Sequence, residues 1–211
     1  MRSVLTVTAP PASLGLTTLT RVKSELAITD SAQDTLLTAR IAEASAAIDS
    51  YLGRDLARAT LTETFRLNCD ENPENLPLAR FPVVAVTAVT EDGITVPPAQ
   101  YELDAAPGHL YRLDTQGSRS QWRSSIGVTV AYSAGYLLPN DAGRTLPGDL
   151  EQAVVKLVCG MHLAAGRDPA IKAEEVPGVQ RIDYWVGAIG GSGGLPPDVT
   201  ALLDPYRNVT L

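Results

Sequence analysis

The sequence predicts an α+β fold, in which a bundle of about four helices carries a small antiparallel β-sheet inserted between the second and third helices. Two observations support this prediction. Apolar residues recur at helical spacing before residue 54 and again after residue 146. Between these regions, β-forming residues alternate with polar ones, and turn signals such as Asp92-Gly93 separate the alternating runs.

The first helical region is expected at residues 17–53. Thr17 or Thr18 is suited to cap a short helix, because a threonine hydroxyl accepts a hydrogen bond from the first turn. Asp30 is the expected N-cap of a longer helix, and Gly53 follows that helix, as glycine often follows a helix C-terminus. The apolar stripe of the longer helix consists of Leu37, Ile41, Ala44, Ile48 and Tyr51.

The β-sheet is expected within residues 60–134, as five or six short strands. Residues 82–90 (PVVAVTAVT) are the most strand-like run, and Pro82 restricts its own position to the start or the edge of a strand. Further strands are expected at residues 61–67, 101–103, 110–113 and 126–132.

Helical spacing returns at residues 147–166, the expected third helix. Asp149 and Glu151 place negative charge in its first turn, where carboxylates complement the helix dipole. We expect this helix and the longer helix of the first region to share one core. That core is formed by Leu37, Ile41, Ile48, Leu150, Val154 and Leu157.

The remaining segments complete the predicted organisation of the chain. Residues 1–16 contain paired prolines and no periodicity, so they are expected to be an extended N-terminal lead-in. Residues 17–211 are expected to be a single domain. Its later parts are a flexible arm at 168–195 and a C-terminal helix at 196–207.

Composition and charge narrow the range of functions. The chain has 211 residues and a net charge of −7, with 17 basic against 24 acidic residues. Proteins that read nucleic-acid sequence usually have the opposite balance, because contacts to phosphate supply much of their affinity. No run approaches the roughly 18 apolar residues of a membrane span, and no secretory signal is apparent. We therefore expect a soluble, intracellular protein without a membrane partner.

Side chains that carry catalysis or bind metals are scarce. The two histidines are His109 and His162, and the two cysteines are Cys69 and Cys159. Cys159 and His162 lie on neighbouring faces of one predicted helix, but a zinc site needs two further ligands that the sequence does not supply. The sequence also lacks nucleophile and phosphate-binding motifs. No catalytic residue, cofactor or metal is predicted, and the chain is not expected to be an enzyme.

The first candidate contact site is the loop at residues 119–123, where Arg119 and Arg123 flank Trp122. Tryptophan beside arginine is typical of protein-interface hot spots and of sites where nucleic-acid bases stack. In the alternative interpretation Trp122 fills the edge of the sheet and the arginines cover it, since tryptophan is highly buried on average.

The second candidate contact site lies in the arm. Between a Pro-Gly turn and a glycine-rich hinge, apolar and polar residues alternate, which is typical of a hairpin that adds to a neighbouring sheet. A strand folded back on its own subunit is the alternative. The residues concerned are Arg181, Ile182, Tyr184, Trp185 and Ile189.

The order of these segments resembles the head–tail connector, or adaptor, family of long-tailed bacteriophages. The resemblance covers most of residues 17–207, and it departs from the shorter members of the family at 168–195. The segments that carry it are LTRVKSELAI at 19–28, DSAQDTLL at 30–37, SYLGR at 50–54, RFPVVAVTAV at 80–89, YELD at 101–104, VTVAYSAGY at 128–136, LPGDLEQAV at 146–154 and LLDPYR at 202–207.

The resemblance implies a structural virion protein at the head–tail interface, assembled in the host cytoplasm. About a dozen neighbouring copies are implied to form a ring on the portal protein, which extends the DNA channel and docks the next connector or tail-completion protein. Phage DNA is implied to pass through without sequence-specific binding. The alternative is a nucleic-acid or small-ligand binding module that uses the loop at 119–123.

Overall fold

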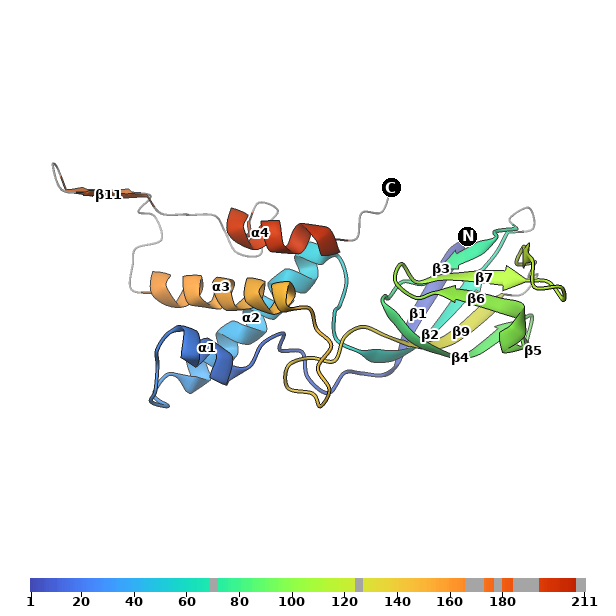
Figure 1. Cartoon of the computed structure of the whole chain (residues 1–211), viewed down its shortest axis with the longest axis horizontal. Helices are drawn as coiled ribbons and strands as arrows, with labels where there is room; N and C mark the ends of the chain where they lie inside the picture. The colour runs from blue at the N-terminus through green and yellow to red at the C-terminus, as the bar shows by residue number, and fades with distance from the viewer. Residues whose placement is uncertain (69–71, 124–126, 166–172, 177–179, 184–193, 208–211) are drawn as a thin grey trace. The chain divides into compact units, whose positions relative to one another are not determined.

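The computed structural model describes residues 1–68, 72–123, 127–165, 173–176, 180–183 and 194–207 (Figure 1). The chain divides into two compact units. The β unit consists of Met1–Ala12 and Leu56–Tyr136, and the helical unit consists of Ser13–Asp55 and Leu137–Leu211. The fold is α+β with four α-helices and antiparallel sheets among the described residues.

The four helices all belong to the helical unit. They are α1 (Leu19–Glu25), α2 (Asp34–Leu52), α3 (Gly148–Ala164) and α4 (Pro197–Leu203), and a 3-10 turn at Asp204–Tyr206 follows α4 (Figure 1). In the part of the chain that the structure describes, none of the helices combines the length and the hydropathy needed to cross a lipid bilayer.

The predicted helix ends are partly confirmed. The Thr18 hydroxyl accepts a hydrogen bond from the backbone N–H of Arg21 at 3.1 Å, as expected of an N-cap. Gly53 ends α2 with a left-handed φ of 67°, which glycine adopts without strain. The prediction for Asp30 was wrong. Its carboxylate accepts from the N–H of Ala32 at 3.0 Å within the preceding turn, and α2 begins later, at Asp34.

The predicted core of the helical unit is confirmed. Helices α2 and α3 pack against each other, and Val199 and Leu203 of α4 are also buried. The predicted core residues, at most 6% exposed, are Leu37, Ile41, Ile48, Leu150, Val154 and Leu157.

A buried carboxylate links the start of α3 to two other segments of the helical unit. Glu151 is 8% exposed. Its Oε2 pairs with Nη2 of Arg144 at 2.7 Å, and its Oε1 accepts from the hydroxyl of Thr17 at 3.2 Å. A buried charge is tolerated only when it is paired. The partners of Glu151 therefore hold the segments that contain Arg144 and Thr17 against the start of α3.

The described residues of the β unit form a five-stranded and a four-stranded sheet, both antiparallel. In spatial order, the larger sheet consists of β1 (Arg2–Ala9), β2 (Ala59–Arg66), β9 (Val128–Ala134), β4 (Val83–Glu91) and β5 (Ile94–Thr95). The smaller sheet consists of β3 (Asn75–Pro77), β7 (His109–Leu113) and β6 (Tyr101–Asp104), with β8 (Arg119–Ser120) also paired to β7. A 3-10 turn, Pro98–Gln100, precedes β6.

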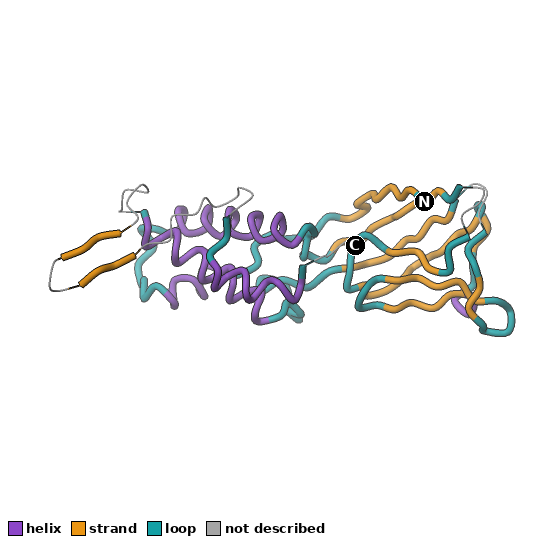
Figure 2. The backbone as a smooth tube through the Cα atoms, turned by 90° about the horizontal axis from the view of Figure 1, so that it is seen from above, coloured by secondary structure: helices purple, strands orange, loops and turns teal. Residues whose placement is uncertain are grey.

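The N-terminal segment, which the sequence predicts to be an extended lead-in, contains a strand of the larger sheet. Residues 2–9 form β1, which pairs along its length with β2 at one edge of the larger sheet (Figure 2). The pairing gives the backbone of this segment hydrogen-bond partners. The strand therefore forms although the apolar residues of the segment show no clear alternation.

The core of the β unit lies between the two sheets. Along β2 and β9, buried residues alternate with more exposed ones, as expected for strands with one face in the core. The largest fully buried side chains of this core are Trp122, Tyr132, Phe65, Leu61, Leu76 and Leu110.

A polar pair lies within this apolar core. Glu63 and Tyr132 are both 0% exposed, and the Tyr132 hydroxyl donates to Glu63 Oε2 at 2.9 Å. The same oxygen accepts from the backbone N–H of Ala79 at 3.0 Å. Burial is the largest cause that raises the pKa of Tyr132, and the negative charge of Glu63 and the hydrogen bond to it raise this pKa further.

We expect Leu157→Ala to lower the free energy of unfolding of the helical unit by about 2–5 kcal/mol, because it leaves a cavity between α2 and α3. Denaturant unfolding followed by far-ultraviolet circular dichroism measures this. Leu163→Ala on the same helix is the matched control and should be nearly neutral, since Leu163 is 76% exposed. Equal effects of the two substitutions would contradict the assigned core.

We expect Tyr132→Phe to lower the free energy of unfolding of the β unit by about 1–3 kcal/mol, because Glu63 loses a hydrogen-bond donor while buried. In a Trp185→Phe background, fluorescence of Trp122 as the sole remaining tryptophan reports the unfolding of this unit.

The same substitution should change the alkaline pH dependence of stability. A folded-state pKa raised above the ordinary value of 10.0 means that the contribution of the neutral phenol is complete below pH 10.0 and is lost as the pH rises further. The wild type should therefore lose more stability than Tyr132→Phe as the pH rises from about 10 to 12. Tyr101→Phe, at a half-buried tyrosine of the same unit, should follow the wild type.

Candidate functional site

The structure separates the three residues of the predicted contact loop. Trp122 is 0% exposed and belongs to the core between the sheets. Its indole N–H donates to the carbonyl of Leu110 at 3.2 Å, and its backbone N–H donates to the carbonyl of Pro73 at 2.9 Å. Trp122 therefore has the position given by the alternative interpretation, a tryptophan that fills the sheet edge, and a role of this residue in protein contact stays a prediction.

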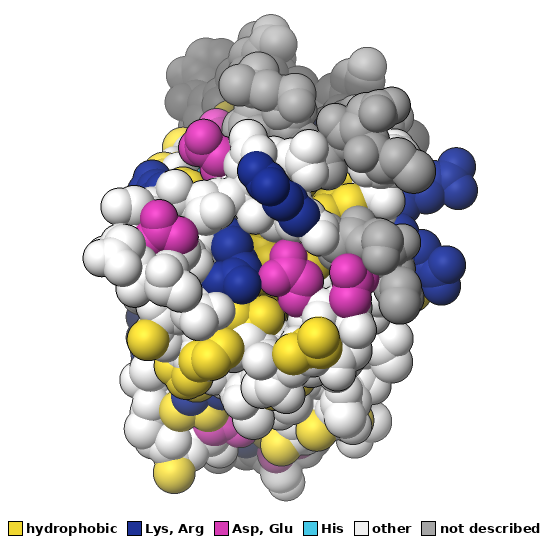
Figure 3. Space-filling model, turned by 90° about the vertical axis from the view of Figure 1, so that its right-hand side faces the viewer, with side chains coloured by type: hydrophobic (Ala, Val, Ile, Leu, Met, Phe, Trp, Pro, Cys, Tyr) yellow, Lys and Arg dark blue, Asp and Glu magenta, His cyan; other side chains and the backbone are white. Residues whose placement is uncertain are grey.

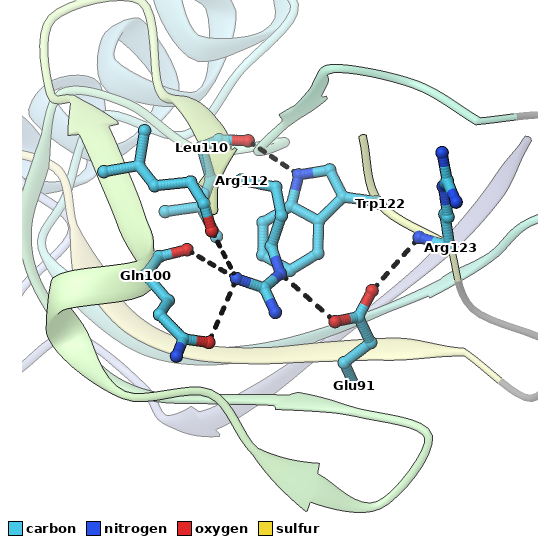
Figure 4. A network of polar contacts seen from close by, with 7 residues as sticks. Glu91, Gln100, Leu110, Arg112, Trp122 and Arg123 are labelled. Atoms are coloured by element: carbon cyan, nitrogen blue, oxygen red, sulfur yellow. Dashed lines mark hydrogen bonds and ion pairs between the residues drawn. The ribbon is translucent and has the colours of Figure 1, made fainter. Parts of the chain in front are cut away.

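Arg112 lies over the indole and organises the loop, although sequence reasoning did not single it out. Its guanidinium carbon is 5.6 Å from the centre of the Trp122 ring. Nε pairs with Glu91 Oε2 at 3.2 Å, while Nη1 donates to the carbonyls of Gln100 and Leu113 at 2.9 and 2.7 Å (Figure 4). These contacts join the end of β4, the 3-10 turn and β7 around one cation.

Arg123 lies on the other side of the same carboxylate. Its backbone N–H donates to Glu91 Oε1 at 3.1 Å, and the residue as a whole is exposed (Figure 4). Both oxygens of Glu91 are therefore used to fix the loop in place. The consequence is that the Arg123 side chain extends from an anchored backbone.

A cavity of about 560 Å³ opens beside this network. It is lined by residues of both charges together with apolar ones, among them Glu91, Ile94, Pro97, Arg112, Asp114 and Arg123. Figure 3 shows acidic, basic and hydrophobic side chains next to one another on the face at this end of the β unit. A mixed surface of this kind suits polar contacts with another protein better than binding of a strongly charged ligand.

Arg119 lies apart from this cavity, on β8. Its guanidinium carbon is 3.8 Å from the centre of the Tyr111 ring, and Nη2 pairs with Glu102 Oε2 at 3.4 Å. Tyr111 also meets His109 edge to face, with ring centres 6.3 Å apart. Arg119 is about half exposed, so this group forms a second polar patch on the smaller sheet.

The described residues outside the loop show no centre for metal binding. Within the described ranges, no three or more histidine, cysteine, aspartate or glutamate side chains gather as metal ligands. His162 lies next to Arg40, whose Nη1 is 2.8 Å from its Nδ1, and Cys159 is half-buried on α3. Burial raises the pKa of the Cys159 thiol, which disfavours the reactive thiolate.

The second predicted contact site is described only in part. Strands β10 (Ala173–Val176) and β11 (Gln180–Asp183) form an antiparallel hairpin, in which Ala173 pairs with Asp183. Arg181 and Ile182 lie in β11. Tyr184, Trp185 and Ile189 lie outside the described residues, so their role as contacts stays a prediction.

The sequence carried a weak signal for Arg112. It follows Leu110 by two residues in an expected strand, so it shares the buried face with that leucine. A charged residue on a buried face requires a partner. Neither Glu91 nor Trp122 can be identified as that partner from spacing alone, because each lies on a different strand or loop.

A comparison with protein families identifies one match. The model of the family described as head completion protein matches residues 15–162, which is more than half of the chain. No curated protein matches the sequence.

Several solved structures share the fold. A chain in the neck of an empty gene transfer agent (GTA) particle, computed with C6 symmetry, is 20% identical with a TM-score of 0.59, covering 99% of this chain and 97% of that one. A chain in the virion of the native GTA particle is 19% identical with a TM-score of 0.58, covering 98% and 96%. A chain in the native neck computed with C12 symmetry is 21% identical with a TM-score of 0.55, covering 99% and 97%.

We expect Arg112→Leu to lower the free energy of unfolding of the β unit by about 1–3 kcal/mol, because Glu91 is left part-buried without its cation. Fluorescence of Trp122 in the Trp185→Phe background should also shift to longer wavelength as the loop loosens. Arg119→Leu is the matched control, since Arg119 is more exposed, and should leave both quantities nearly unchanged. The assigned role of Arg112 fails if the two variants behave alike.

Proposed function

The chain belongs to the head completion protein family, and from this membership we propose that it forms a ring on the portal of a phage-like particle. In this proposal the ring extends the DNA channel and docks the next connector or tail-completion protein. The family is one of structural virion proteins, and the chain is a structural head–tail connector protein.

The observation that carries the proposal is the similarity of fold over nearly the whole chain. Chains from GTA necks computed with C6 and with C12 symmetry both match across 99% of its residues. A subunit of a cyclic ring contacts two neighbours through two different surfaces. The fold thus supports a ring, for which the C12 symmetry of the similar neck suggests twelve copies.

Surface charge supports the proposed passage of DNA. A channel lined with basic residues would bind phosphates tightly and slow the movement of DNA. The chain has a net charge of −7, which favours weak contact with DNA over the whole surface. We therefore propose that DNA passes the ring without being bound in a sequence-specific way.

The loop at residues 119–123 suits protein contact better than nucleic-acid binding. Because Trp122 is 0% exposed, its ring offers no face on which a base could stack. Arg123 and Arg119 are both exposed, and Arg119 can exchange its ion pair with Glu102 for one with a partner. We propose that these two arginines contact the portal or a neighbouring copy.

The proposed function is tested by mixing the purified chain with the portal ring of its own particle and examining the mixture by electron microscopy. We expect a second ring stacked coaxially on the portal. A portal that stays bare at concentrations where the chain is folded would contradict the proposal. Tight, salt-sensitive binding to DNA instead would favour a nucleic-acid binding module.

We expect the double reversal Arg119→Glu with Arg123→Glu to leave the subunit folded and to weaken assembly at least about tenfold, because like charges at an interface repel. Co-sedimentation with the portal measures assembly. The control reverses Arg21 and Lys156, which lie on exposed positions of the helical unit, and keeps the change in net charge the same. Normal assembly of the loop variant would assign both arginines to ordinary surface.

A further inference from the structure

One edge of the larger sheet is open. Strand β1 lies at the end of the strand order and pairs with β2 on one side, and no other strand of the described residues pairs with it. Seven of its eight residues are exposed, and only Leu5 is half-buried. Val4 and Val7 are 59% and 45% exposed. The N–H and C=O groups on the outer side of β1 are thus accessible to another strand.

Proteins usually protect such an edge. Lysine, proline, an inward-pointing charge or a short strand prevents pairing with another chain. In β1 the only charged residue is Arg2, at its start, and the prolines Pro10 and Pro11 come after its end. A register shift between Val7 and Ala9 affects only its last residues. Residues 3–6 therefore form an unprotected edge, which is typical of a site for strand addition.

The hairpin formed by β10 and β11 also has open edges. Each strand has four residues, and among the described residues each pairs only with the other. A hairpin of two strands alone is marginally stable in water. Addition to an existing sheet would supply the missing hydrogen bonds on one of its sides.

The charges of the two elements are complementary. Arg2 and Arg66 are cross-strand partners at one end of the edge, and both are exposed. Like charges directly opposite each other are unfavourable, so this end of the sheet favours an acidic partner. Strand β10 has the sequence Ala-Glu-Glu-Val. In either register of an added strand, one of two consecutive glutamates falls on the same face as the arginines.

We infer that the β10–β11 hairpin of one copy of this chain adds to the β1 edge of a second copy. The edge and the hairpin are two different surfaces of one chain, which is the arrangement that a closed ring needs. The contact between two copies stands on these observations alone, and only its repetition around a ring rests on the proposed function.

A charge-swap experiment tests the pairing with this chain alone. The edge variant carries Arg2→Glu and Arg66→Glu, and the hairpin variant carries Glu174→Arg and Glu175→Arg. Analytical ultracentrifugation of each variant alone should show association weakened at least about tenfold, because like charges then face each other. An equimolar mixture of the two variants should recover wild-type association, since each copy then meets opposite charge. This recovery also shows that both variants are folded.

Hydrogen exchange measured by mass spectrometry separates strand addition from a contact of side chains only. In the associated wild type, peptides covering residues 1–9 and 173–183 should both exchange more slowly than in dilute protein. The variant with Arg21 and Lys156 reversed is the matched control and should behave like the wild type.

The inference is overturned if the mixture does not recover association. It is also overturned if the wild type associates without protection of residues 1–9, or stays monomeric at high concentration. These outcomes are independent of the portal. Recovery of association by a chain that does not bind the portal would contradict only the proposed function, and portal binding without recovery would contradict only this inference.

Discussion

The position of Trp122 is the constraint on which the contact loop depends. A fully buried indole between two sheets requires a hydrogen-bond acceptor for its N–H, and the carbonyl of Leu110 provides it. Arg112 covers the ring and takes Glu91 as its counter-ion. Once these groups are in place, the backbone of Arg123 is held by the second oxygen of Glu91. These contacts hold the indole of Trp122 and the backbone of Arg123 in place.

The residues of the loop therefore differ in role, because Trp122 is buried in the core whereas Arg119 and Arg123 are exposed. The buried ring of Trp122 and the half-buried cation of Arg112 stabilise the β unit, while Arg119 and Arg123 remain exposed at its surface. A preorganised surface loses little conformational entropy when a partner binds, which favours the protein contact proposed for these arginines.

The helices were predictable because their signals are local. The stripe of α2 that includes Leu37 and the stripe of α3 that includes Leu157 both follow helical spacing, and such a stripe is buried where its helix packs. The start of α2 was misplaced because Asp30 can cap a turn as well as a helix. Strand β1 was missed because its partner is distant in the sequence and its residues are exposed on both faces. The role of Arg112 depends on Glu91 and Trp122, which only the tertiary structure brings together.

The pairing of Arg2 with Arg66 has a consequence for the order of events during synthesis. Strand β1 leaves the ribosome before β2, which is its partner, and before β9, which is the central strand of the sheet. Pairing between distant segments is slow and leaves strands exposed to other chains in the meantime. The nascent chain therefore exposes an uncovered β1 while α1 and α2, whose contacts are local, can already form. Pro10 and Pro11 lie between β1 and α1. Because proline disfavours the interior of a helix, these residues keep the helical region from extending into β1 before β2 is available.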